Sequence, residues 1–109
     1  MAQSIYANKI IAVAAAAGSG GWLFLSPKPD GQDYTLIFTA AAWGSTGIQL
    51  SAVGGDTDAN WCDEKETISG TTGTIAITQN STRRCPGGIY IRLNPTALSG
   101  GEYITMIAL

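Results

Sequence analysis

Short apolar runs that alternate with period two, each bounded by turn-forming residues, are the feature that most constrains how this chain can fold. The clearest run is YTLIFTA at residues 34–40, in which Tyr34, Leu36 and Phe38 would share one face of a strand. Successive side chains of a strand point to opposite faces, so this alternation is typical of β-structure. The pattern predicts an all-β protein whose strands are joined by turns.

Similar runs occur elsewhere, namely WLFLS (22–26), IQLSAV (48–53), TIAITQ (74–79), GGIYIRLN (87–94) and EYITMIAL (102–109). In GGIYIRLN we expect Ile89, Ile91 and Leu93 to face inward. The residues between them, including Arg92, are expected to face outward. Residues that suit turns separate the runs, in SPKPDGQD, WGSTG, GGDTDAN, SGTTG and LSGG.

The segment KIIAVAAAAG at residues 9–18 allows two readings. Its alanines favour a helix, whereas the alternation of Lys9, Ile11 and Val13 and the glycine-rich turn that follows favour a strand. We read it as a strand, which brings the total to about seven or eight strands. Their regular spacing predicts a single antiparallel β-sandwich domain, jelly-roll-like, over residues 1–109, with residues 1–8 as an N-terminal arm.

Charged residues are scarce, since they make up 13% of the 109 residues, against about 25% in an average globular domain. Hydrophobic residues reach 45%, so we expect a partner to cover much of the surface, in a homo-oligomer or a larger assembly. A net charge of −2 with scattered basic residues predicts no nucleic-acid binding. The apolar run 10–17 has the form of a secretory signal but is too short to span a bilayer, so we expect neither a leader nor a membrane partner.

The chain has no histidine, which removes the usual general base of neutral-pH catalysis and the commonest transition-metal ligand. We therefore expect no enzymatic activity, no metal and no cofactor. A disulfide between Cys62 and Cys85, the only cysteines, would close a loop of about two dozen residues and stabilise the fold by about 3 kcal/mol. A protein kept in a reducing cytoplasm would leave both thiols free. The spacing does not decide, and pairing is slightly favoured.

One acidic stretch, DTDANWCDEKE, begins like a calcium loop, because Asp56, Asp58 and Asn60 could all face one ion. The match ends at Trp61, where such a loop needs glycine, and at Thr67, where it needs glutamate. We therefore favour a solvated turn over a metal site.

The tryptophans and a pair of arginines each allow a functional and a structural interpretation. Trp22, Trp43 and Trp61 could stack on sugar rings. Each also adjoins a turn at a strand end, where a large ring can seal the core or an interface, and sealing is favoured. Arg83 and Arg84 could form an ion pair between subunits or lie in a solvated turn, and the turn is favoured.

The stretch AAWGSTGIQLSAVGGDTDANW resembles small β-sandwich structural proteins of tailed bacteriophages. In that family a Trp-Gly turn opens a strand, a Gly/Asp-rich turn and another tryptophan follow, and a later strand that starts Gly-x-Tyr precedes a Gly-rich turn. These features correspond to Trp43–Gly44, 48–53, 54–61, 88–93 and 100–101. The resemblance covers about residues 34–109 and does not include the cysteines or the dense acidic turn.

The resemblance implies a non-enzymatic virion protein, assembled in the cytoplasm of a bacterial host, that decorates or cements the capsid and is usually a trimer. Its partners would be copies of itself and the major capsid protein or other virion proteins. Assembly contacts are expected from Met1, Gln3, Ile5, Tyr6, Trp43 and Trp61. A phage fibre or tail component is one alternative, and a secreted carbohydrate-binding β-sandwich is another.

Overall fold

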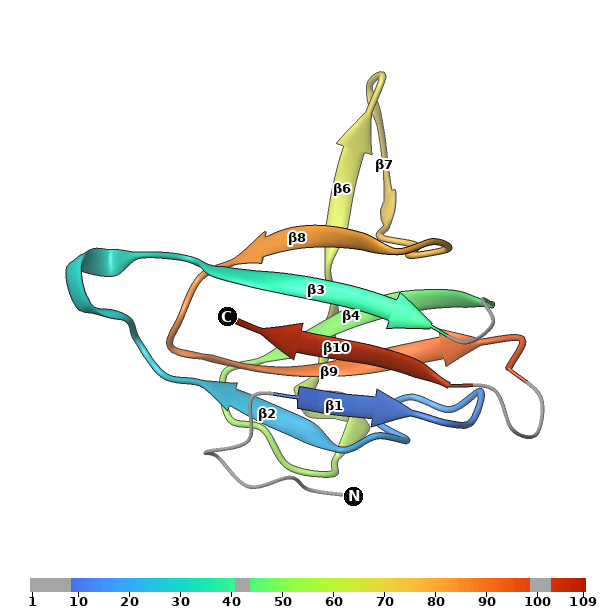
Figure 1. Cartoon of the computed structure of the whole chain (residues 1–109), viewed down its shortest axis with the longest axis horizontal. Coiled ribbons are helices and arrows are strands. Elements are labelled where there is room, and N and C mark those ends of the chain that lie inside the picture. The colour runs from blue at the N-terminus through green and yellow to red at the C-terminus, as the bar shows by residue number, and fades with distance from the viewer. Residues whose placement is uncertain (1–8, 41–43, 99–102) are drawn as a thin grey trace.

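The computed structural model describes residues 9–40, 44–98 and 103–109, and these form two packed β-sheets with a projecting hairpin (Figure 1). Sheet 1 has the order β1 (Lys9–Ala12), β10 (Ile104–Ala108), β3 (Tyr34–Ala40) and β8 (Ser81–Cys85). Sheet 2 has the order β2 (Trp22–Leu25), β9 (Ile89–Thr96), β4 (Ser45–Ser51) and β5 (Cys62–Asp63). Two short 3-10 turns, η1 (Pro29–Gly31) and η2 (Asp58–Asn60), lie in connections. No helix within these ranges is long and apolar enough to cross a membrane.

The strand pairing is that of a jelly roll. The partners are β1 with β10, β2 with β9, β3 with β8 and β4 with β5, all antiparallel. Successive pairs lie alternately in sheet 1 and sheet 2, as if one long hairpin were rolled across both layers. The predicted all-β, jelly-roll-like sandwich is therefore confirmed, although the described residues form ten strands, eight in the two sheets and two in the hairpin, instead of the seven or eight expected.

The core lies between the two sheets and follows the predicted alternation. Leu36 and Phe38 are buried on β3, and Ile91 and Leu93 are buried on β9, as expected. Other core side chains of the described residues come from both ends of the chain, namely Ile10, Ala12, Leu23, Leu25, Ile104, Met106 and Ala108. Burial of these aliphatic groups, about 1.5 to 3 kcal/mol for each large side chain, holds the sheets together.

The structure confirms one of three local predictions and corrects the other two. Residues 9–12 form a strand with Ile10 and Ala12 buried, so the strand reading is confirmed and the helix alternative is wrong. Strand β4 begins at Ser45, within the segment WGSTG that was predicted as a turn. Of the predicted strand 74–79, only Thr74 lies in a strand, at the end of the hairpin, and residues 75–79 make a single bridge, between Thr46 and Ile77, although they bury two isoleucines.

A hairpin formed by β6 (Lys65–Ile68) and β7 (Thr71–Thr74) projects from the sandwich and was not predicted (Figure 1). Its two-residue turn has positive φ at Ser69 (52°) and Gly70 (82°), the backbone that suits a tight hairpin. The side-chain oxygens of Thr67 and Thr72 lie 2.6 Å apart across the strands. Threonine and glycine leave no apolar alternation, so periodicity could not reveal these strands.

Candidate assembly surface

Most residues predicted to make assembly contacts lie outside the described part of the chain. This holds for Met1, Gln3, Ile5 and Tyr6, all within the predicted arm 1–8, and also for Trp43. Their roles remain predictions.

Trp61, the remaining predicted contact, is buried within the subunit, with 7% of its surface exposed. Its indole N–H donates a hydrogen bond of 3.0 Å to the carbonyl of Gly55. The guanidinium carbon of Arg92 lies 4.7 Å from the ring centre. Trp61 therefore seals its own loop and offers no free aromatic face for stacking on a sugar.

Arg92 corrects the expectation that outward-facing residues of β9 are exposed, because only 4% of its surface is accessible. It belongs to a row that crosses sheet 2, with Trp22 and Gln49 as its two cross-strand neighbours and Asp63 beyond Gln49. Its Nε donates to Gln49 Oε1 at 2.7 Å, and Gln49 Nε2 donates to Asp63 Oδ1 at 2.8 Å. Its Nη2 donates to Asp58 Oδ1 at 3.1 Å. The alternation correctly placed Arg92 on the outer face of sheet 2, but it did not reveal that the β4–β5 loop covers this residue.

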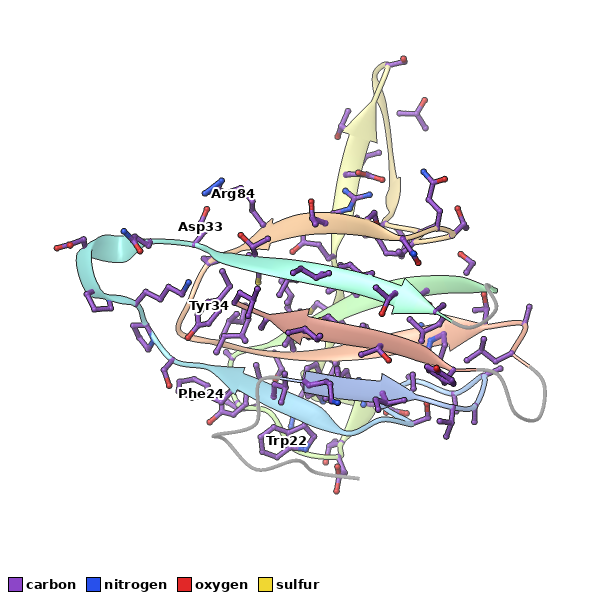
Figure 2. All side chains as sticks on the ribbon, in the orientation of Figure 1. Trp22, Phe24, Asp33, Tyr34 and Arg84 are labelled. Carbon is purple, nitrogen blue, oxygen red and sulfur yellow. The ribbon has the colours of Figure 1, made fainter. Side chains whose placement is uncertain are left out.

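An aromatic cluster continues this covered face. The rings of Trp22 and Tyr90 meet edge to face at 5.3 Å, and those of Phe24 and Tyr90 lie 4.7 Å apart. Figure 2 shows Trp22 and Phe24 side by side along β2. All three rings are half-buried. With the β4–β5 loop, this cluster covers the outer face of sheet 2 with side chains of the same subunit.

The acidic loop before β5 forms an ion pair with the guanidinium group of Arg92. The carboxylate of Asp58 pairs with buried Arg92, although the Asp58 side chain is itself 83% exposed. Within the described ranges, no group of three or more histidine, cysteine, aspartate or glutamate side chains could hold a metal ion. The residues Asp56, Asp58 and Asn60 are all exposed, as a turn at the surface requires.

The slightly favoured disulfide is absent, and both cysteines are free. Cys62 is exposed on the edge strand β5, whereas Cys85 is buried in the core at the end of β8. The two residues thus occupy different sheets and different environments. Burial, assisted by the charges of Glu64 and Asp33, raises the pKa of the Cys85 thiol to about 11.

The two arginines lie on strand β8 rather than in a turn, and each pairs within the subunit. Arg83 forms a bidentate ion pair with Glu66 of the hairpin, in which Nη1 donates to Oε2 at 2.5 Å and Nη2 donates to Oε1 at 3.3 Å. Arg84 lies 3.9 Å from the Asp33 carboxylate, and Figure 2 shows the two side chains near the turn that precedes β3. Because Arg84 and Asp33 are well exposed, that second pair contributes little to stability.

The outer face of sheet 1 has a different character from that of sheet 2. One row across its four strands contains Lys9, Ile107, Ile37 and Thr82, and the next includes Ile11, Thr105 and Thr39. Thr35 and Arg84 complete the outward-facing set, in which no residue is acidic. We name these nine residues the isoleucine–threonine face. Ile11 is 39% exposed, and the other two isoleucines are half-buried.

Comparison with known proteins gives no relative: no family model, curated protein or solved structure matches the chain.

Proposed function

We propose that the chain is a non-enzymatic structural protein of a tailed-bacteriophage virion, and specifically a capsid decoration or cement protein. The observation that carries the proposal is the contrast between the two outer faces of the sandwich. Sheet 2 is covered by its own loop and aromatic rings, whereas sheet 1 presents β-branched side chains with cations at its margins. The jelly-roll fold and the resemblance to phage β-sandwich proteins agree with this role.

The isoleucine–threonine face is the proposed contact surface. A stable interface buries about 800 Å² on each partner, and the outer face of a four-stranded sheet is suited to supply such an area. Lys9, on the edge strand β1, would favour a partner surface with carboxylates, whereas Arg84, on the opposite edge strand β8, already lies 3.9 Å from the Asp33 carboxylate of the same subunit. Repetition of the same contact over a symmetric shell would add avidity to each modest interaction.

The expected partners are the major capsid protein or other virion proteins, together with sister copies in a trimer. The projecting hairpin favours the fibre or tail alternative, because an exposed hairpin offers two open strand edges for pairing. The buried Trp61 argues against the carbohydrate-binding alternative. Assembly would take place in the bacterial host cytoplasm.

Mass spectrometry of purified particles tests the virion assignment. We expect the chain in many copies per particle, near the copy number of capsid subunits for a cement protein and at a few copies for a tail part. Absence of the chain from purified particles would contradict the assignment.

A variant pair tests the contact face. Ile37→Glu and Ile107→Glu place a charge in the centre of the isoleucine–threonine face and should reduce binding to particles by about tenfold or more while the subunit stays folded. Val53→Glu, at a 65% exposed position in the β4–β5 loop, is the matched control and should bind as the wild type does. Equal binding by all three variants would rule out this face.

A further inference from the structure

A pocket of about 330 Å³ opens at one end of the sandwich, beside the hairpin. Its floor is apolar and comes from three strands and one connection, with Leu36 of β3, Ile48 and Leu50 of β4, Ile75 after β7, and Cys85 of β8. Glu64, Glu66 and Arg83 are among the charged groups at its rim. The pocket shares Arg84 with the isoleucine–threonine face on the outside of sheet 1, and the other eight residues of that face do not line it.

The pocket exists because β5 is only two residues long. It pairs with β4 at Gln49 and Leu50, and the chain then leaves sheet 2 to form the hairpin. The edge of β4 beyond this point is covered by the returning segment 75–77 instead of by a full strand. The space between β4 and β8 is therefore incompletely filled, and aliphatic side chains line it.

The walls are held by backbone hydrogen bonds, so the pocket is preformed. Ile75 N–H donates to the Glu64 carbonyl at 3.1 Å. Ile77 and Thr46 exchange two hydrogen bonds, of 3.0 and 2.9 Å. At the rim, the ion pair between Arg83 and Glu66 fixes the base of the hairpin to sheet 1.

The chemistry of the lining favours a neutral guest. Cys85 is 4% exposed and its thiol is protonated at neutral pH, so it behaves as a small apolar group. At the rim Arg83 pairs with Glu66, and Arg84 lies 3.9 Å from the Asp33 carboxylate. Lys65 adjoins Glu64 along the chain, so no charge of one sign dominates. The Glu64 carboxylate accepts a hydrogen bond of 3.2 Å from the Lys65 N–H through Oε1, and its second oxygen can serve as an acceptor for a hydroxyl group.

We propose that this pocket binds a small neutral amphiphile, with a single aromatic ring or a branched aliphatic body on the apolar floor and a hydroxyl group at the Glu64 rim. An apolar protein cavity of about 150 Å³ holds benzene, and ligand pockets begin at about 300 Å³. At about 330 Å³ this pocket exceeds both volumes, so it has room for a phenol-sized molecule.

Titration of the full chain with p-cresol, followed by NMR, tests the proposal. The methyl resonances of Ile48 and Ile75 should shift and reach saturation, whereas those of Ile10 and Ile104, which do not line the pocket, should stay in place. Shifts that rise linearly without saturation, or that are equal at all four residues, would overturn the proposal.

Two substitutions add the same ring in different places. Ile75→Trp fills the pocket and should weaken p-cresol binding by about tenfold or more, whereas Ile11→Trp, on the outer face of sheet 1, should leave binding unchanged. If Ile75→Trp does not fold, Leu50→Phe at a half-buried floor position replaces it with the same expected loss. Wild-type affinity in a folded pocket-filling variant would refute the site.

Discussion

The guanidinium group of Arg92 lies over the indole ring of Trp61, with its central carbon 4.7 Å from the ring centre. This contact fastens the β4–β5 loop across the outer face of sheet 2, because Arg92 belongs to β9 and Trp61 follows the loop. The same arginine also binds Gln49 within the sheet and Asp58 within the loop. One buried cation thus joins a strand to the segment that covers it.

Replacement of Arg92 by methionine should destabilise the fold by about 2 to 3 kcal/mol, since it removes buried charge-assisted hydrogen bonds and a desolvated cation–π contact. Asp58→Asn keeps an acceptor oxygen for Arg92 Nη2 and removes only the charge of this exposed side chain, so it should cost less than about 1 kcal/mol. Urea unfolding followed by tryptophan fluorescence measures both changes. Equal losses for the two variants would show that the loop contact depends on the Asp58 charge instead.

Gly54 is expected to be far less replaceable than its neighbour Gly55. Both have positive φ, +68° and +89°, so alanine costs about 1 to 2 kcal/mol of backbone energy at either position. At Gly54 an added Cβ would also lie 2.7 Å from the Tyr90 ring, whereas at Gly55 it meets nothing within 4 Å. Thermal unfolding should therefore show a clearly larger loss for Gly54→Ala, by about 1 to 3 kcal/mol. Similar losses for both variants would mean that Tyr90 moves aside without cost.

The sequence predicted which residues pack between the two sheets better than it predicted the loops, the hairpin and the pocket around them. Burial between two sheets imposes period two, so Leu36, Phe38, Ile91 and Leu93 could be assigned to the core. Arg92 could not, because its burial depends on a loop that folds back from a distant part of the chain. The hairpin and the pocket were missed for a related reason. Threonine-rich strands carry no apolar signal, and the pocket is formed by segments that meet only in three dimensions.

Acid should loosen the hairpin through Glu66. The hydrogen bond from Arg83 holds the pKa of this carboxyl below its ordinary value of 4.5. The ionised pair thus stabilises the fold above that value, and this stabilisation is lost as the pH falls through the lowered pKa. Wild-type protein should lose more stability than Glu66→Gln as the pH falls below about 4.5, as measured by unfolding midpoints. Asp30→Asn, in an exposed turn, is the matched control and should follow the wild type. Parallel curves for wild type and Glu66→Gln would contradict this role of the pair.

The two thiols should differ strongly in reactivity. In native protein without reductant, Cys62 is exposed and should react with Ellman's reagent at once. Cys85 should stay protected, because it is buried and its thiolate is scarce at neutral pH. Both thiols should react after denaturation, and mass spectrometry of the alkylated chain should show two adducts. If neither thiol reacts until a reductant is added, Cys62 and Cys85 form a disulfide after all.

Alkaline pH should destabilise the protein through Cys85. The fold raises the pKa of its thiol from an ordinary 9.0 to about 11, chiefly by burial. Below pH 9 both states hold the proton, but between those two values the unfolded chain releases it and the folded chain does not, so the free energy of unfolding falls as the pH rises. Cys85→Ala lacks this proton and should show a flatter decline of stability across the same range in chemical unfolding. Cys62→Ala, at the exposed thiol, serves as the matched control and should keep the steeper wild-type decline. Identical slopes for wild type and Cys85→Ala would show that the folded state accommodates the Cys85 thiolate.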